Sequence, residues 1–330
     1  MRRIFANHSN ELALVAFIAV ISLFLSATTK TFFSLGNALD LLNISAVNII
    51  FAVGLLVVLA SGGVDISFSV AASVAQYLTV LAVVSLGRLN WLCGLLFAIG
   101  FGITLMSINA FLIRQFRVIS IIITISTFNV YFGLLMFFTK GHSLFDLPGW
   151  LAKTVVVFER EVEGGDWLEI KLPVLAMVAC VAATWILLTR TTIGRQIFAF
   201  GDNAEAANRL GINIRAIQYF SYGWLGMMAG IAGLMQIHYT KEVVPQALVG
   251  RELDVLAAVV LGGARLGGGK GSVSGCVLGV LLIAITQNGL NLMGVSPFAF
   301  QMVAGLIIII AITLSSLKLT ARKPLKGLPS

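Results

Sequence analysis

The sequence predicts an all-α, polytopic membrane protein that forms a single domain over residues 1–330. Hydrophobic residues make up 58% of the chain and charged residues only 11%, so lipid rather than water must surround most of it. Apolar runs of spanning length recur along the chain, separated by short polar segments. The net charge of +8 comes from basic residues scattered between these runs, and no basic patch interleaved with aromatic residues indicates nucleic-acid binding.

Taken in order, the apolar runs predict about ten membrane spans. The first run, 12–28, is close to spanning length and lacks an Ala-x-Ala exit site, so we expect it to be retained and not cleaved as a signal peptide. The run at 253–263 is short, and we expect it to be a partial or broken helix. The other runs are 39–60, 68–86, 91–113, 118–139, 172–189, 217–238, 273–290 and 298–317.

Two irregular segments interrupt the apolar runs, one in each half of the chain. Residues 61–67 read Ser-Gly-Gly-Val-Asp-Ile-Ser, and residues 262–271 are rich in glycine. Irregular backbone at membrane depth is tolerated only where it lines a cavity or is buried in protein, and such pairs are typical of broken helices around a transport path. Two roles are open for Asp65. It caps a helix that begins at Ile66, which we favour, or it contacts substrate directly.

Neutral polar side chains within the spans indicate what kind of solute passes. Apart from Asp65, the mid-span positions offer almost no charge to hold an ion, which favours a neutral, polyhydroxylated solute. For each of these side chains, a hydrogen bond between helices is the alternative role. The candidate path residues are Ser61, Gly62, Gly63, Asp65, Ser67, Gln76, Asn109, Thr124, Gln287 and Asn288.

A short polar segment from Gly201 to Ile212 lies between long apolar runs. Asp202 followed by Glu205 is a helix-start pattern, and Gly211 is a natural stop. Small side chains that share one face at helical spacing would let another protein approach the backbone closely, so we expect a docking element; an ordinary solvated helix is the alternative. The docking residues are Asp202, Asn203, Ala206, Ala207, Leu210 and Gly211.

The distribution of charge orients the chain with both termini in the cytoplasm. Acidic residues gather in the loop 140–171, which we expect to lie outside, while the loop 190–216 that holds the docking element is expected inside. The expected inner segments carry Arg2, Arg3, Arg114, Arg117, Arg190, Arg195, Arg209, Arg215, Arg265, Lys270 and a basic tail.

Catalytic and cofactor motifs are not recognisable in the sequence. The run Gly267 to Ser272 superficially resembles a phosphate-binding loop, but Ala264 and Gly271 occupy positions that need Gly and Ser or Thr. The three histidines lie far apart, and the three cysteines lie in separate apolar runs, so neither a metal site nor a disulfide is expected. Glycines spaced four residues apart, such as Gly226 and Gly230, indicate close helix packing.

Three motifs together resemble the ribose-type permeases of bacterial ATP-binding-cassette (ABC) importers. They are residues 61–67, residues 194–212 with their Gly-Arg-Gln-Ile-Phe-Ala-Phe-Gly-Asp-Asn start, and residues 252–263, and the likeness covers nearly the whole chain in order. The resemblance implies an inner-membrane permease that pairs with a second permease subunit, a cytoplasmic ABC ATPase and a periplasmic substrate-binding protein. It also implies that Gly201 to Ile212 is the coupling helix and that residues 61–67 belong to the membrane path.

We therefore expect a permease without catalysis of its own that imports a neutral sugar, such as a pentose or hexose, by alternating access. Autoinducer-2 uptake permeases look similar and are one alternative. An ion-coupled secondary transporter is another, but only Asp65 clearly offers it a titratable group in the path. Two departures from the family pattern, the bulky Phe68 and the long acidic loop 140–171, bear on the choice of substrate or binding protein.

Overall fold

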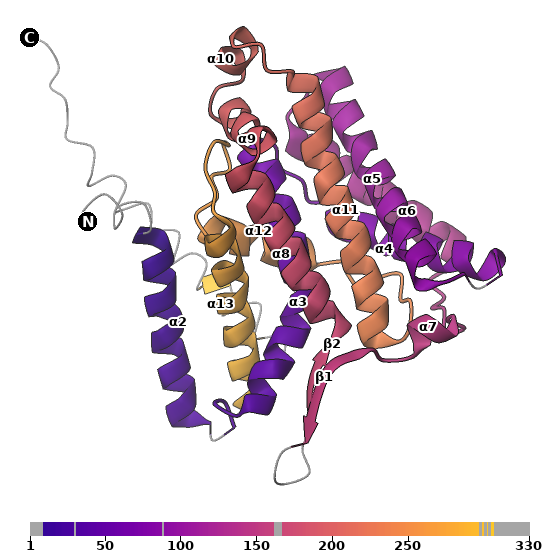
Figure 1. The fold of residues 1–330 in the computed structure, drawn as a ribbon, viewed down its shortest axis with the longest axis vertical. Coiled ribbons are helices and arrows are strands. Elements are labelled where there is room, and N and C mark those ends of the chain that lie inside the picture. The colour runs from indigo at the N-terminus through magenta and orange to yellow at the C-terminus, as the bar shows by residue number, and fades with distance from the viewer. Residues whose placement is uncertain are drawn as a thin grey trace, which may run out of the picture.

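The computed structural model describes residues 9–29, 31–87, 89–161 and 167–296, together with residues 299, 302, 305 and 306. The described chain is a bundle of long helices with one short β-hairpin at its lower end in Figure 1, which confirms the all-α, polytopic class. The expected span at 298–317 falls almost entirely outside the described residues. Arg2, Arg3 and the basic tail also lie outside them.

The long helices correspond one to one with the predicted apolar runs, and their ends differ from the expected ones by a few residues. They are α2 (Ser9–Thr28), α3 (Leu35–Ala60), α4 (Phe68–Ser85), α5 (Trp91–Phe116), α6 (Ser120–Thr139), α8 (Leu172–Arg190), α11 (Ile214–Thr240) and α13 (Val273–Leu292). The shorter helices are α7 (Gly149–Ala152), α9 (Thr192–Asp202), α10 (Ala204–Arg209) and α12 (Arg251–Leu261). As expected, α12 is too short to span a membrane.

Seven helices within the described residues are long and apolar enough to cross a membrane, and α11 is not among them although it has 27 residues. Its sequence carries polar side chains, and Ser221, Gln236 and His238 are buried within the protein. α11 packs against α3, α4 and α5, so protein and not lipid surrounds its polar groups. The fold thus explains how a less apolar helix is tolerated at the centre of the bundle.

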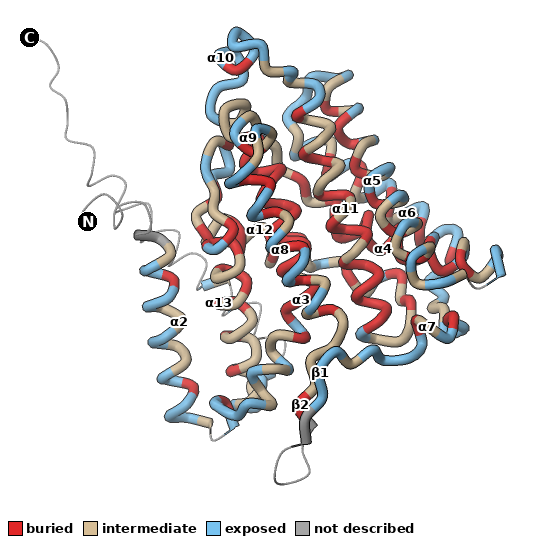
Figure 2. The backbone as a smooth tube through the Cα atoms, viewed as in Figure 1, coloured by how far each residue is buried: buried red, intermediate tan, exposed pale blue. Residues whose placement is uncertain are grey.

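The core is centred on α3, whose residues from Ser45 to Ala60 are nearly all buried (Figure 2). Two glycine pairs bring other helices close together. A Cβ on Gly102 of α5 would fall on the carbonyl of Gly226 in α11, and a Cβ on Gly275 of α13 would fall on the carbonyl of Gly262. These contacts confirm the packing role predicted for the glycine stripes.

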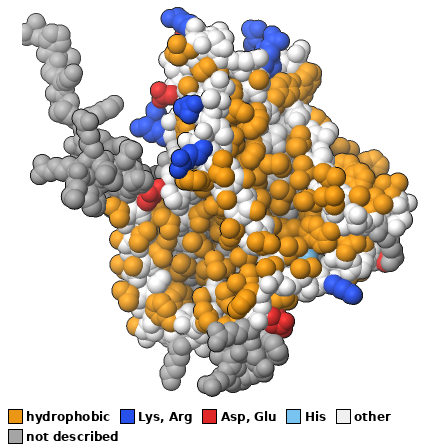
Figure 3. All heavy atoms as spheres, in the orientation of Figure 1, with side chains coloured by type: hydrophobic (Ala, Val, Ile, Leu, Met, Phe, Trp, Pro, Cys, Tyr) orange, Lys and Arg blue, Asp and Glu red, His pale blue; other side chains and the backbone are white. Residues whose placement is uncertain are grey.

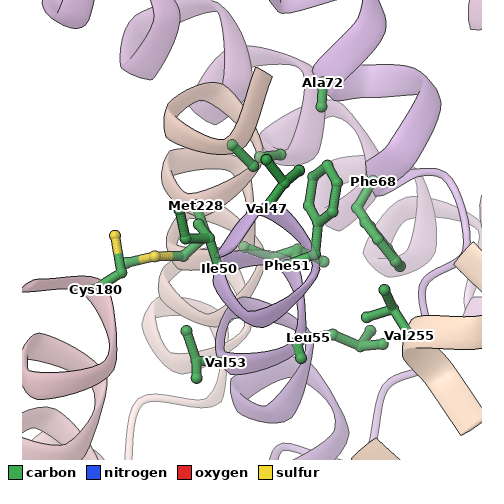
Figure 4. Packing of buried hydrophobic residues seen from close by; sticks show 14 of the residues in the cluster. Val47, Ile50, Phe51, Val53, Leu55, Phe68, Ala72, Cys180, Met228 and Val255 are labelled. Atoms are coloured by element: carbon green, nitrogen blue, oxygen red, sulfur yellow. The ribbon is translucent and has the colours of Figure 1, made fainter. Parts of the chain in front are cut away.

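Phe68, the bulky residue that departs from the family pattern, belongs to the buried core. Its side chain is fully buried, and its ring lies 5.1 Å from the ring of Phe51 on α3. Figure 4 shows the Phe68 side chain next to that of Phe51 and pointing toward Val255. Its bulk therefore fills the space between α3, α4 and α12.

The molecule has two distinct ends, which we name the α10 end and the hairpin end (Figure 1). At the hairpin end, strands β1 (Val156–Glu161) and β2 (Trp167–Lys171) pair antiparallel, with Glu159 opposite Glu169. The side chain of Asn43 on α3 donates to the carbonyl of Glu169 at 3.1 Å, which ties the hairpin to the bundle. The acidic loop 140–171 is therefore a folded cap that contains α7 and the hairpin.

Candidate functional site

The first interruption follows α3 directly and is shaped by a turn at Gly62. Ser61 is the C-cap of α3, and Gly62 adopts a left-handed φ of 88° that a residue with a side chain would rarely adopt. The next helix, α4, begins at Phe68 and not at Ile66, which corrects the expected start. The chain turns because Asp65 Oδ1 accepts the backbone N–H of Ser67 at 2.6 Å and its hydroxyl at 2.8 Å. Asp65 therefore forms a side-chain turn that leads into α4, whose N-cap is Ser67.

Asp65 is fully buried, and side chains from two other helices complete its surroundings. Asn109 of α5 donates to Asp65 Oδ2 at 3.0 Å and to Ser67 Oγ at 2.7 Å. Tyr131 of α6 donates to Asn109 Oδ1 at 3.5 Å. We call Asp65, Ser67, Asn109 and Tyr131 the Asp65 network. Both carboxylate oxygens are occupied by protein donors, which favours the capping role over substrate contact, although the choice stays a prediction.

The irregular backbone of this interruption is satisfied by α6. The N–H of Val64 donates to Ser120 Oγ at 2.8 Å, and Thr124 Oγ1 donates to the carbonyl of Val64 at 3.4 Å. Polar backbone groups at membrane depth must find such partners. Thr124, predicted as a path residue, thus supports the interruption.

A further break precedes α12, outside the two interruptions predicted from the sequence and at a place that was not assigned to the path. Gly250 has a left-handed φ of 95°, and Glu252 follows in the first turn of α12 with 7% exposure. Glu252 Oε2 accepts the hydroxyl of Ser69, in the first turn of α4, at 2.6 Å, and the N–H of Gly250 at 3.0 Å. The first turns of the two interrupted helices therefore meet. A buried acid at the start of a half-helix was the signal that could have pointed to Glu252.

A polar face runs along α4 away from this meeting point. Ser69, Ser73 and Gln76 lie at helical spacing and are all buried. The amide nitrogen of Gln76 donates to the carbonyl of Val244 at 3.3 Å. Ser73 Oγ and Gln76 Oε1, however, are buried with no hydrogen-bond partner among the described residues. We call Ser69, Ser73 and Gln76 the α4 polar face.

The remaining predicted path residues have separate places in the fold. Ser61 Oγ donates to the carbonyl of Val58, within its own helix end. Asn288 and Asn37 donate to each other at 2.9 and 3.1 Å, which is the alternative role of bonding one helix to another. Gln287 lies on the same helix, near Asp254 on α12. The structure therefore does not gather the ten predicted residues into one site.

Three glycines bring both interruptions and the docking segment into direct backbone contact. A Cβ on Gly268 would lie 2.8 Å from the Cα atoms of both Gly62 and Gly201, and a Cβ on Gly201 would fall on the carbonyl of Ala60. The N–H of Gly269 donates to that same carbonyl at 3.0 Å. We call the contact of Gly62, Gly201 and Gly268 the Gly201 junction. Because these backbones are in direct contact and no side chain fits between them, a shift of the end of α9 would displace both interruptions.

The helix α10, which was predicted to be a docking element, lies at the tip of the molecule and differs from the prediction in two details. Its N-cap is Asn203, which accepts the N–H of Ala206 at 2.9 Å, whereas Asp202 ends α9. Ala207 is only 2% exposed, so it faces the protein and cannot share an outward docking face. This corrects the predicted face, because the short helix needs one apolar side chain to pack inward.

The other predicted docking residues, Asp202, Asn203, Ala206, Leu210 and Gly211, are all exposed, and Leu210 is 80% exposed. Gly211 follows with a left-handed φ of 78° and ends the helix as predicted. Elsewhere on α10, Glu205 and Arg209 form an exposed ion pair at 2.6 Å. A single exposed leucine is normal on a protein surface, so docking at this tip stays a prediction.

An unpaired cation marks the hairpin end. Lys241, the C-cap of α11, has a left-handed φ of 61°, and its Nζ is buried with no hydrogen-bond partner among the residues described. Burial lowers the pKa of Lys241, and the nearby charge of Lys171 lowers that pKa further. Lys171 itself lies 3.7 Å from Glu169.

Interrupted helices that meet inside a membrane bundle, joined by backbone contact to an exposed helical tip, define a multi-pass membrane transport protein. The chain belongs to the family described as "Branched-chain amino acid transport system / permease component", which it matches over residues 37–312.

Three curated relatives cover most of the chain. The ribose import permease protein of Escherichia coli strain K12 is 32% identical over 93% of this chain and 92% of its own length. A probable ABC transporter permease protein of the same strain is 31% identical over 98% and 94%. The L-arabinose transport system permease protein of that strain is 29% identical over 82% and 80%. No solved structure matches the chain.

Proposed function

We propose that this chain is the translocation subunit of an ABC importer that moves a neutral sugar, such as a pentose or hexose, across the bacterial inner membrane. The names of the relatives, which include ribose and arabinose permeases, support the class of solute. The observation that carries the proposal within the structure is the α4 polar face.

The α4 polar face suits hydroxyl groups and not ions. A buried polar atom without a partner costs roughly 1–3 kcal/mol, and Ser73 Oγ and Gln76 Oε1 are two such atoms three residues apart on one helix. A hydroxyl donates and accepts hydrogen bonds and carries no charge, so a sugar would satisfy both atoms. Glu252, the nearest acid to this face by hydrogen bonding, is already engaged by Ser69 and Gly250.

The proposed orientation places the α10 end in the cytoplasm and the hairpin end in the periplasm, with both termini cytoplasmic. On the side drawn in Figure 3, most Lys and Arg side chains gather at the α10 end. Positively charged residues are in excess on the cytoplasmic side of membrane proteins, so this distribution supports the proposed orientation. A cytoplasmic ABC ATPase would then dock on α10, and a periplasmic binding protein would deliver sugar at the hairpin end. A second permease subunit, identical or related, would complete the pathway.

In the proposed mechanism the ATPase moves α10 and α9, and the Gly201 junction transmits the motion to both interruptions. The first turns of α4 and α12, joined by the bond between Ser69 and Glu252, would then separate or close around the solute. Ion coupling is less well supported, because Asp65 is fully buried and its carboxylate is occupied by Ser67 and Asn109. Autoinducer-2, which is also rich in hydroxyl groups, is the alternative solute.

Transport in proteoliposomes tests the proposal. The chain is reconstituted with a candidate ABC ATPase and a candidate periplasmic binding protein, and uptake of labelled ribose, arabinose and autoinducer-2 is measured. We expect uptake of one of the sugars to require ATP and to persist when the proton gradient is collapsed. Uptake driven by a proton or sodium gradient without ATP would contradict the ABC assignment. Uptake of autoinducer-2 in preference to both sugars would contradict the sugar assignment.

Ser73→Ala tests the α4 polar face itself. Removing an unpartnered buried hydroxyl should raise the free energy of unfolding by roughly 1 kcal/mol or more, while the half-saturating sugar concentration rises because one hydrogen bond to the solute is lost. Thr79→Val is the matched control, since the Thr79 hydroxyl on the same helix is already bonded to the carbonyl of Ala75 at 2.6 Å. If Ser73→Ala leaves the sugar affinity unchanged, the α4 polar face does not contact the sugar and the proposal for this face is wrong.

A further inference from the structure

A basic cavity opens at the α10 end, between the last turns of α5 and the first turns of α11. Its volume is about 710 Å³, and no Asp or Glu is among its lining residues. Three arginines, Arg114, Arg117 and Arg215, line it together with Gln218 and Tyr219. This cavity is separate from the α4 polar face, and the proposed sugar path does not use it.

The cavity gathers positive charge that the protein leaves unbalanced. Among the described residues, the ion pairs do not involve any of the three arginines. A guanidinium stays charged at every physiological pH, so three of them around one cavity repel each other unless an anion lies between them. The N-terminus of α11, which starts at Ile214 beside Arg215, adds the positive end of a helix dipole. Guanidinium forks match the oxygens of a phosphate group.

The position of the cavity relative to the membrane follows from the length of α5. Its 26 residues extend about 39 Å, which exceeds the roughly 30 Å of the hydrocarbon layer. Arg114, in the last turn, therefore lies at the level of the lipid headgroups. Phe111 lines the same cavity one turn deeper and is 52% exposed. The cavity is thus charged at its outer end and apolar toward the membrane, which fits a ligand with one anionic and one apolar part.

We propose that this cavity binds the phosphate headgroup of an anionic phospholipid of the cytoplasmic leaflet, with an acyl chain against Phe111. The inference rests on the orientation given under the proposed function. The volume lies within the range of about 300–1,000 Å³ that is usual for organic ligands, more than a bare phosphate fills. Basic pockets between helices on the cytoplasmic side suit such headgroups. Because Arg215 follows α10 closely in the chain, a bound lipid would also hold the base of the docking helix.

The test counts bound lipid on the purified full chain by native mass spectrometry, with phosphatidylglycerol and phosphatidylcholine as probes. The test variant combines Arg114→Gln, Arg117→Gln and Arg215→Gln, which removes charge but keeps length and hydrogen bonding. Arg190→Gln is the matched control, because Arg190 lies at the same end of the molecule but stacks on Trp185, 5.4 Å from its ring. We expect phosphatidylglycerol affinity to fall roughly 5-fold for each cavity arginine removed. The control and phosphatidylcholine binding should be unchanged.

Several outcomes would overturn the assignment. The lipid site is wrong if the triple variant binds phosphatidylglycerol as tightly as the parent. It is also wrong if inorganic phosphate alone raises the melting temperature as much as phosphatidylglycerol does, since the ligand is then a soluble anion. If the triple variant no longer binds the ATPase but still binds phosphatidylglycerol, the cavity is a protein-docking surface and not a lipid site. Arg117→Gln alone keeps the test valid if the triple variant fails to fold. Lipid counting needs no transport, so this proposal and the proposed function can fail separately.

Discussion

Substitution of one glycine at the Gly201 junction should disconnect the docking helix from the membrane path. A Cβ on Gly201 would fall on the carbonyl of Ala60 and lie 2.7 Å from the nitrogen of Gly269, closer than real Cβ atoms come. Both neighbours are backbone atoms and cannot rotate away. Gly201→Ala must therefore push the end of α9 away from both interruptions. Overpacking of this kind costs about 1–3 kcal/mol, which reduces the population of the packed junction roughly 5-fold to 160-fold.

The expected result for Gly201→Ala is a protein that inserts and binds the ATPase through the exposed face of α10, but takes up sugar at least several-fold more slowly. Uptake, ATP hydrolysis and ATPase pull-down are measured on the same proteoliposomes. Gly133→Ala on α6 is the matched control, because a Cβ there meets no atom within 4 Å, and the change should leave uptake intact. Parental uptake and melting temperature in Gly201→Ala would refute both the tight packing and its role in coupling.

Three further predictions follow from other parts of the structure. Asp65→Asn should transport almost normally because it keeps an acceptor for the N–H of Ser67, whereas Asp65→Ala should lower the free energy of unfolding by roughly 1–3 kcal/mol, measured by thermal melting. Leu210→Asp should abolish ATPase pull-down without changing the melting temperature, since Leu210 is 80% exposed. Lys241→Met should raise the melting temperature at neutral pH, because the burial that lowers the pKa of Lys241 makes its charged form costly. In the parent, stability should accordingly rise as the pH is raised through the folded-state pKa toward the ordinary value of 10.5.

Each of these predictions has a control and a contrary result. An Asp65→Asn protein that is inactive yet as stable as the parent would assign Asp65 to the substrate. The control Glu205→Ala, elsewhere on α10, should still bind the ATPase. If Glu205→Ala also failed to bind the ATPase, the assignment of Leu210 to the docking surface would be wrong. Lys140→Met is matched to Lys241→Met, because Lys140 is also a left-handed C-cap but is exposed. Equal shifts in the two lysine variants would exclude the buried charge as the cause.

Much of the fold could be read from the sequence because lipid imposes long apolar runs and confines irregular backbone to special places. The break at residues 61–67 was visible for that reason, and so was the half-helix α12. Contacts between distant residues were not visible. Ser69 and Glu252 are 183 positions apart, and no local pattern indicates that their helices meet.

The face a short helix turns inward was also beyond local reasoning. Helical spacing placed Ala207 with Ala206 and Leu210, but which side of α10 faces the protein depends on packing by the rest of the chain, and Ala207 proved to be buried. Phe68 is a similar case, because no local pattern indicates that its ring packs against Phe51 of α3. Tertiary packing decided these points.

The central position of α11 has a consequence for how the protein is made. A nascent helix partitions from the translocation channel into the bilayer according to its own hydrophobicity, and α11 is less apolar than the seven helices that meet the criterion for a span. Its buried Ser221, Gln236 and His238 find a favourable environment only among neighbouring helices. We therefore expect α11 to insert together with already synthesised α3, α4 and α5, so that its biogenesis depends on their prior assembly.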